Sequence, residues 1–361
     1  MNWIDQNTAG KYLLFDEPLL LFAAMIEDIK SASKSIFLQT YRFANDAIGQ
    51  KFKTELTKKA KQGVEVIILI DSWGTGVSER YFSEMISYGG KVKFFKKVKF
   101  SFDFFNANHR RNHRKMLIID DETVYIGSSN ITNYCINWRE SILRMKGGIS
   151  KKFKKIFFSD YNISNKFYQN KKTYSKILRY QSFEIIRDVP SNRIQPTRDK
   201  FRKLINEAKE EIIIETPYFL PGSSLRKALL EAVKRGVKVK IIIPLHSDVR
   251  MFDILRNKYL GMYYKNNIDI IQYTPNNLHA KLFVIDNKTF LMGSSNFDYR
   301  SFRFMHEINI CGDDEEIVEL IKNHLNETET ESEPFSYEKW KKRRLGTKII
   351  ERLLVPIRHF F

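Results

Sequence analysis

Cysteine, long apolar runs and leader-like features are scarce or missing in this sequence. Its 361 residues contain two cysteines, Cys135 and Cys311, which are too few for a disulfide framework and suit a reducing compartment. No window reaches about 18 uninterrupted apolar residues, so we expect no transmembrane helix. The first residues show no basic segment followed by an apolar one, so we also expect no signal peptide.

Negative charge is in short supply as well. The chain has 42 Asp+Glu against 61 Lys+Arg, which gives a formal net charge of +19. A field of that sign favours polyanionic partners, either nucleic acid or an anionic lipid surface, although Lys-rich proteomes also make basic proteins without such a ligand. The hydrophobic content of 43% indicates a globular protein, and the length suffices for two medium domains.

One sequence pattern occurs twice. His113–Asn130 reads HRKMLIIDDETVYIGSSN, and His279–Asn296 reads HAKLFVIDNKTFLMGSSN. In both, His-x-Lys is followed by four residues, Asp, six further residues and Gly-Ser-x-Asn. The surroundings repeat too, because KKAKQGVEVIIL at 58–69 aligns with EAVKRGVKVKII at 231–242. We infer an internal duplication.

Both halves predict the same order of elements. Strand, helix and strand are predicted over Ser35–Tyr41, Ile48–Gln62 and Val64–Asp71. The same order returns over Glu211–Thr216, Ser223–Arg235 and Val237–Pro244. Such units predict parallel strand pairs. Each motif predicts a hairpin with its His and Lys on the same face at the entry to one strand.

We therefore predict an α/β protein with two tandem domains related by a pseudo-two-fold duplication. Each domain is expected to have a mixed, mostly parallel central sheet flanked by helices. The polar and basic stretch Asn162–Lys176 has no periodicity, so we expect the linker there. The expected units are residues 1–165, residues 166–326, and a segment 327–361 in which an acidic spacer precedes a basic amphipathic tail.

The recurring residue types suit chemistry at a phosphate ester. A neutral imidazole can attack phosphorus and form a covalent intermediate, while a second, protonated imidazole donates to the leaving oxygen. Histidine's ordinary pKa of about 6.5 makes both forms accessible near neutral pH. Two lysines and two asparagines would stabilise charge on the equatorial oxygens. Because the lysines take the cationic role and no His–carboxylate cluster has metal-ligand spacing, we expect no metal and no cofactor.

The two segments resemble the paired HKD motifs of the phospholipase D superfamily. Within it, the chain is most similar to bacterial cardiolipin synthases. The likeness includes TPYFLPG at 216–222 and GSSNFDYRSFRFMHEINI at 293–310, and it covers roughly residues 10 to 325. It implies two tandem phospholipase D-like domains that share one in-chain active site, so no obligatory oligomer is expected.

The resemblance also implies a role for each motif residue. The implied catalytic set is His113, Lys115, His279, Lys281, Glu140 and Glu307. Of these, His113 is taken as the nucleophile and His279 as the acid/base, while the glutamates hydrogen-bond the histidines and fix their tautomers. Substrate phosphate would be bound by Asn130 and Asn296, with support from Ser128 and Ser294. The motif aspartates, Asp120 and Asp286, are implied to be structural.

The implied activity is that of a phosphatidyltransferase. It passes a phosphatidyl group through a phosphohistidine to a lipid alcohol headgroup such as phosphatidylglycerol, or to glycerol. A phospholipase D hydrolase would differ only in using water as the acceptor, and a phosphodiester nuclease would also suit the basic charge. A non-catalytic lipid- or nucleic-acid-binding relative is a further class, but two intact motifs argue against it.

Two segments favour a lipid surface. Lys91–Phe105 interleaves lysines with phenylalanines, either as a strand and loop over the core or as a wall of the active-site mouth. After Lys339, a basic helix would carry apolar residues four apart at Leu345, Ile349, Leu353 and Ile357. Such a helix suits an anionic membrane interface, the alternative being a terminal helix docked on the body. We expect a cytoplasmic protein, peripheral to the inner face of the cell membrane, with an anionic phospholipid surface and a phospholipid substrate as partners. Nucleic acid is a partner only if the chain is a nuclease.

Overall fold

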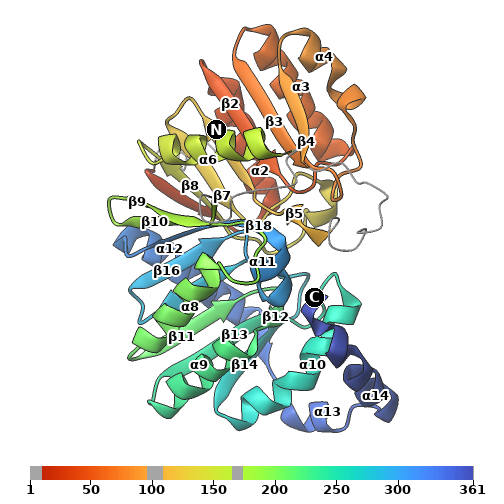
Figure 1. Ribbon diagram of the computed structural model, residues 1–361, viewed down its shortest axis with the longest axis vertical. Coiled ribbons are helices and arrows are strands. Elements are labelled where there is room, and N and C mark those ends of the chain that lie inside the picture. Colours follow the sequence, from red (N-terminus) through yellow and green to blue (C-terminus); the bar gives the residue numbers. More distant parts are fainter. Residues whose placement is uncertain (1–9, 96–108, 165–173, 361) are drawn as a thin grey trace.

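The two halves of the chain form two α/β units stacked on one another (Figure 1). The computed structural model describes residues 10–95, 109–164 and 174–360. The first unit contains a seven-stranded sheet in the order β1 (Tyr12–Phe15), β8 (Ile142–Lys146), β7 (Thr123–Gly127), β6 (Met116–Ile119), β2 (Ser35–Thr40), β3 (Glu65–Asp71) and β4 (Lys91–Phe95). Its α-helices are α2 (Pro18–Ser31), α3 (Ala47–Lys61), α4 (Ser83–Ser87) and α6 (Ser150–Ile163).

The second unit repeats this plan around a larger sheet. Its strands run in the order β19 (Ser332–Pro334), β14 (Ile268–Tyr273), β13 (Lys238–Pro244), β11 (Glu211–Glu215), β15 (Leu282–Ile285), β16 (Thr289–Gly293), β18 (Met305–Gly312), β10 (Phe183–Asp188) and β9 (Lys176–Tyr180). Strand β5 (Arg111–Asn112), from the first half, pairs with β18. The main helices are α8 (Pro196–Glu207), α9 (Ser223–Lys234), α10 (Arg250–Lys265), α11 (Tyr299–Phe304) and α12 (Glu315–Thr330). The α/β duplication predicted from the repeats is confirmed.

The sheets are mixed, but the prediction that they are mostly parallel was wrong. Parallel pairing joins β2 to β3 and β3 to β4 in the first sheet, and β11 to β13 and β13 to β14 in the second. Each motif hairpin adds two antiparallel strands beside this parallel core. Further antiparallel strands, such as β8 and β18, extend the hairpins outward, so antiparallel pairs predominate within the described strands.

One hydrophobic core joins the two sheets. In β2 and β3, Phe37, Ile67 and Leu69 face this shared core, where they meet side chains of α6, α12 and the second sheet. The intervening residues, such as Ile36 and Ile68, face a separate core beneath α2 and α3. Because both faces of the strands are covered, their sequences are almost continuously apolar. Because residues of both motif hairpins belong to this shared core, it fixes the position of one hairpin relative to the other.

The expected acidic spacer is the end of a helix. Helix α12 continues to Thr330, and β19 then pairs with β14. The acidic side chains are engaged by the body of the protein, because Glu327 pairs with Arg139 and Glu329 pairs with Lys240. After β19 come α13 (Tyr337–Lys341), α14 (Leu345–Leu354) and a final 3-10 helix η3 (Val355–Phe360).

Two predictions fall partly outside the described residues. The boundary between the expected units, at residues 165 and 166, lies in the undescribed range 165–173. Of the Phe/Lys segment, Lys91–Phe95 forms β4, while residues 96–105 also lie outside the described part. Among the helices that are described, none has the length and apolar character needed to cross a bilayer.

Candidate active site

The motif aspartates anchor the hairpins at the turns. Asp120 and Asp286 adopt positive φ angles of 54° and 52°, in turns where Asp and Asn tolerate a left-handed conformation. The Asp120 carboxylate accepts hydrogen bonds from the backbone N–H groups of residues 33, 34 and 35, where β2 begins. Asp286 accepts equivalent bonds from residues 209, 210 and 211, before and at the start of β11. The contacts of these two carboxylates are structural.

The two motif histidines reach one pocket because each is held by backbone from the opposite half. Strand β5 pairs with β18, and the His113 N–H donates to the His306 carbonyl at 3.0 Å. The His279 N–H likewise donates to the Arg139 carbonyl at 2.7 Å. His113 and His279 both line a pocket of about 240 Å³, together with Asn130.

Each histidine is bound by the glutamate of the opposite half. Nδ1 of His113 lies 3.0 Å from a carboxylate oxygen of Glu307. Nδ1 of His279 lies 2.9 Å from a carboxylate oxygen of Glu140. The family resemblance pointed to both glutamates but did not say which histidine each would meet. The cross-pairing makes each half of the site dependent on the other half of the chain.

The hydrogen bonds identify the reactive nitrogen of His113. Its Nδ1 also lies 3.1 Å from the backbone carbonyl oxygen of Ser294. A carbonyl oxygen can only accept, so this nitrogen carries the proton and donates. The unprotonated nitrogen of the neutral ring is therefore Nε2. With Nδ1 occupied in both histidines, Nε2 is the position left for chemistry.

The two His–Glu pairs differ in charge. Burial, followed by the positive charges of Lys115 and Lys281, holds the pKa of His113 well below its usual range. Burial also raises the pKa of its partner Glu307 to about 8. In the other pair, burial would raise the pKa of Glu140, but His279 and Lys281 outweigh it and leave that pKa lowered. Burial lowers the pKa of His279 as well, but there the ionised Glu140 opposes the shift. Every group that shifts the pKa of His113 lowers it, so His113 is the histidine held more firmly in the neutral form.

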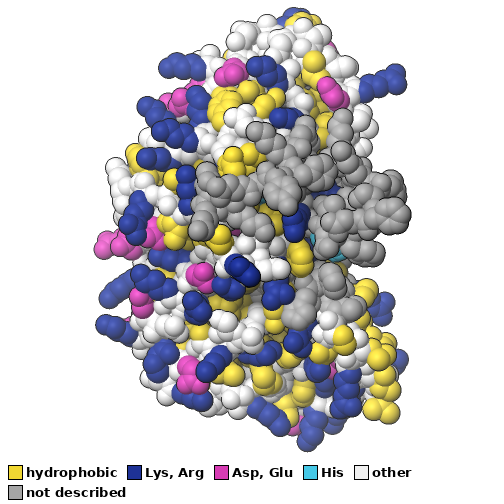
Figure 2. Space-filling model, viewed as in Figure 1, with side chains coloured by type: hydrophobic (Ala, Val, Ile, Leu, Met, Phe, Trp, Pro, Cys, Tyr) yellow, Lys and Arg dark blue, Asp and Glu magenta, His cyan; other side chains and the backbone are white. Residues whose placement is uncertain are grey.

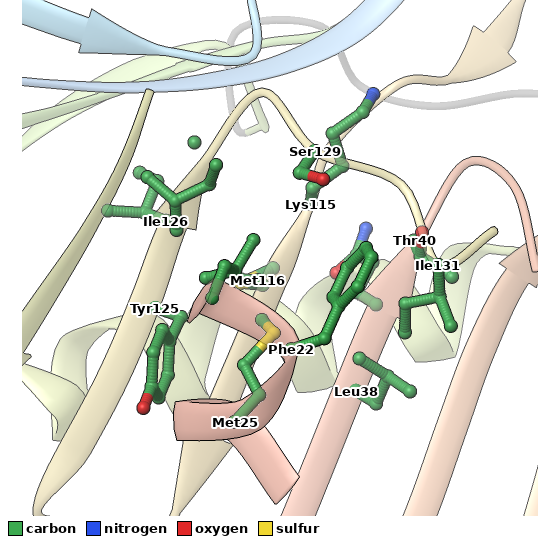
Figure 3. Close-up of a pocket in the computed structure, with 14 residues that line it drawn as sticks. Phe22, Met25, Leu38, Thr40, Lys115, Met116, Tyr125, Ile126, Ser129 and Ile131 are labelled. Atoms are coloured by element: carbon green, nitrogen blue, oxygen red, sulfur yellow. The ribbon is translucent and has the colours of Figure 1, made fainter. Parts of the chain in front are cut away.

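The motif lysines are buried beside the histidines. Their Nζ atoms donate to backbone carbonyls, Lys115 to His113 at 2.6 Å and Lys281 to His279 at 2.7 Å. Burial lowers the pKa of Lys115 to about 7 and that of Lys281 to about 8, against the raising effect of the two site glutamates. Lys115 also borders an apolar cavity of about 20 Å³ within the first unit, which Figure 3 shows.

Comparison with known proteins identifies the family. The chain matches the family model described as "Cardiolipin synthase, PLD-like domain" over residues 25–161 and 201–328. The chain belongs to this family. It is 31% identical to the cardiolipin synthase of Clostridium perfringens (strain SM101 / Type A), over 93% of this chain and 75% of that protein. It is 30% identical to the major cardiolipin synthase ClsA of Bacillus subtilis (strain 168), over 93% of this chain and 73% of that protein.

A solved structure shares the architecture. The phosphatidylserine synthase of Haemophilus influenzae Rd KW20 superposes with a TM-score of 0.79 at 13% sequence identity. The match covers 98% of this chain and 96% of that one. At this identity the likeness concerns the fold alone.

The motif asparagines line the pocket, whereas the motif serines are buried behind it. Asn130 and Asn296 line the pocket, as phosphate-binding residues would. Ser128 and Ser294 are fully buried away from the pocket wall, and their hydroxyls donate to Glu140 and Glu307. The expected support of phosphate by the serines is therefore corrected: they hold the glutamates, since the side chain after the motif glycine faces inward.

Three further residues of the pocket, Tyr41, Trp138 and Asp248, were not predicted from the sequence. The Tyr41 ring lies 5.3 Å from that of His113, and the Trp138 ring lies 5.2 Å from that of His279. Asp248 lines the same pocket from the segment between β13 and α10. Tyr41 directly follows strand β2, but the aligned position in the second half is Pro217, so the repeat did not mark it. Trp138 and Asp248 have no counterpart that would have marked them.

Proposed function

We propose that the chain is a phosphatidyltransferase of the cardiolipin synthase type, which acts through a phosphohistidine. The observation that carries this proposal is the pair of histidines in one pocket, each bound at Nδ1 by a buried glutamate. Relatives that bear the name cardiolipin synthase, at about 30% identity over most of the chain, support the choice of a lipid substrate.

The first half-reaction loads the phosphatidyl group onto His113. Its neutral Nε2 attacks the phosphorus of a donor phospholipid, so that a P–N bond forms and the bond from phosphorus to the headgroup oxygen breaks. His279, protonated against the ionised Glu140, donates its proton to the leaving oxygen. Asn130, Asn296 and the motif lysines stabilise the charge that develops on the phosphoryl oxygens.

The second half-reaction reverses these roles. The hydroxyl of the acceptor lipid attacks the phosphorus while the now neutral His279 accepts its proton. The P–N bond breaks and His113 returns to its neutral state. Atoms and protons balance over the cycle, because His279 gives one proton to the first headgroup and takes one from the acceptor. Water in place of the acceptor would give hydrolysis by the same steps.

The difference between the two His–Glu pairs supports His113 as the nucleophile. A nucleophile must be neutral, and burial with nearby lysines holds His113 in that form. A general acid must be readily protonated, and an ionised partner favours the imidazolium. Glu140 supplies that partner to His279: burial lowers the pKa of this histidine, and Glu140 acts against that shift.

We further propose that the C-terminal tail binds an anionic membrane surface on the cytoplasmic side. The tail is docked by Trp340, whose indole donates to the Asn257 carbonyl at 2.7 Å and whose ring lies against Gly261. Beyond this anchor, α14 leaves four large apolar side chains exposed: Leu345, Ile349, Ile350 and Leu353. Figure 2 shows hydrophobic side chains gathered at this corner of the molecule, next to Lys and Arg. Apolar residues on a basic helix favour a lipid interface.

The test uses purified protein on liposomes of phosphatidylglycerol and phosphatidylethanolamine, followed by mass spectrometry of the lipids. We expect cardiolipin to form, and His113→Ala to abolish it. His246→Ala is the matched control, because this exposed histidine lies outside the motifs and should leave the yield unchanged. Intact lipids together with cleavage of single-stranded DNA would instead identify a nuclease.

A further inference from the structure

The pocket is lined by positively charged side chains other than the motif lysines. In the proposed transfer, the motif lysines and asparagines serve the phosphate between the histidines. Two guanidinium groups, Arg42 and Arg300, line the same pocket in addition. The carboxylates in its lining have other partners: Asp248 accepts from the Tyr218 hydroxyl at 2.6 Å, and Asp298 accepts from the Ser301 N–H at 2.7 Å. Neither carboxylate forms an ion pair with Arg300 in the described part of the chain. Burial raises the pKa of Asp298, and bonds from Ser301 and the charge of Arg300 oppose that shift.

The guanidinium of Arg300 has an unsatisfied donor among the described residues. It makes no hydrogen bond or ion pair with any part of the chain that the structure describes, and its Nε is buried without an acceptor. Arg42 differs, because its guanidinium lies 5.1 Å from the centre of the Tyr134 ring. A buried donor left unpaired costs free energy, which an incoming anion would recover. The planar fork of an arginine matches the oxygens of a phosphate.

The position of Arg300 is set by the element that follows the second motif. Helix α11 begins at Tyr299, and its N-cap Asp298 holds the first turn through Ser301. Arg300 is thus fixed on a short helix at the pocket wall. It is close enough to His113 to contribute, after burial, the lysines and His279, to the lowered pKa of that histidine.

The proposed transfer involves two phosphates. The donor lipid brings the phosphate that reacts. An acceptor such as phosphatidylglycerol carries its own phosphate, one glycerol unit away from the attacking hydroxyl. Glycerol and water carry none. A second anion-binding group in the pocket therefore distinguishes among the three acceptors that share one mechanism.

We propose that Arg300 binds the phosphate of the acceptor lipid, so that the site selects a phosphate-bearing alcohol over a neutral alcohol or water. The inference rests on the proposed phosphatidyl transfer and specifies its acceptor. Arg300 acts here as a specificity residue and takes no part in the bond changes at the reacting phosphorus.

The experiment compares acceptors within one reaction. Full-length protein is incubated with phosphatidylglycerol vesicles and deuterated glycerol, and three products are measured by mass spectrometry. Cardiolipin reports transfer to the lipid, deuterated phosphatidylglycerol reports transfer to glycerol, and phosphatidic acid reports transfer to water. For Arg300→Gln we expect the ratio of cardiolipin to deuterated phosphatidylglycerol to fall about 10- to 100-fold, as for loss of a hydrogen bond to a charged group.

Two further variants control the interpretation. Arg303→Gln removes the same charge from the same helix, but Arg303 lies outside the pocket lining and over the Tyr299 ring, so the ratio should not change. Arg300→Lys keeps the charge without the fork and should restore part of the ratio, which separates binding from folding.

The other outcomes overturn the inference in distinct ways. An equal fall in all three products would assign Arg300 to the reacting phosphate. An unchanged ratio in Arg300→Gln would remove any role in acceptor choice. If the unmodified protein yields no product with any acceptor, the proposed transfer itself fails and the acceptor site fails with it.

Discussion

Replacing Glu140 by glutamine tests the division of labour between the two histidines. The carboxylate is fully buried and lies 2.9 Å from Nδ1 of His279. The amide is of similar size but carries no charge. It therefore removes the ionised partner that favours the imidazolium form of His279, while the shape of the site is kept.

The expected magnitude follows from this one contact. A hydrogen bond to a charged group contributes about 1.5–3 kcal/mol. Loss of this bond should therefore lower the pKa of His279 further in Glu140→Gln. The sign is clear, since Glu140 is a group that raises this pKa against burial. Less His279 is then protonated near neutral pH, and the first half-reaction should slow by roughly 10- to 150-fold.

The assay is the rate of headgroup release from phosphatidylglycerol vesicles, measured at a series of pH values for three proteins. In Glu140→Gln the limb that requires protonated His279 should move to lower pH. Glu307→Gln is the matched comparison. Burial raises the pKa of Glu307 to about 8, so this residue already carries a proton near neutrality and the amide should cost less than about tenfold.

Two results would refute this reasoning. Equal losses in both variants would show that the pairs are not differentiated. A pH profile for Glu140→Gln that coincides with that of the unmodified protein would show that His279 does not depend on the charge of Glu140. Circular dichroism of each variant confirms that the fold is retained, which keeps either result interpretable.

Two further predictions concern stability and membrane binding. His324 pairs with buried Glu215 at 2.8 Å, and its pKa is raised to about 9, because Glu215 and Asp16 outweigh burial. The contribution of protonated His324 to the free energy of unfolding is on the order of 3 kcal/mol. It is fully present below about pH 6.5 and is lost as the pH rises through about 9. In urea unfolding, His324→Gln should therefore destabilise the protein most near about pH 6 and little near about pH 9.5. A deficit independent of pH would contradict this linkage. Replacing Leu345 and Leu353 with serine should weaken sedimentation with phosphatidylglycerol vesicles at least about tenfold, whereas exposed Leu19→Ser on α2 should not. Equal sedimentation of the two proteins would argue against the tail's role.

Local pattern was sufficient for much of the fold. The hairpins of both motifs, the strand–helix–strand units and the duplication were predicted to within about two residues, because alternation, turn residues and repeat spacing act over short distances. The Asp at each hairpin turn is an example, since a left-handed conformation and the adjacent strand ends suffice to place it. The identities of the motif histidines, lysines and asparagines were also readable from the repeat alone.

Tertiary structure decided how these residues combine. Glu307 lies 194 positions from His113, and Glu140 lies 139 positions from His279, so no local rule could assign the partners. Burial behind the pocket turned Ser128 and Ser294 from phosphate ligands into supports for the glutamates. The charge of a side chain is visible in a sequence, but whether it is already paired is not. That distinction sets Arg300 apart, because its Nε is buried with no acceptor among the described residues once the two halves are packed together.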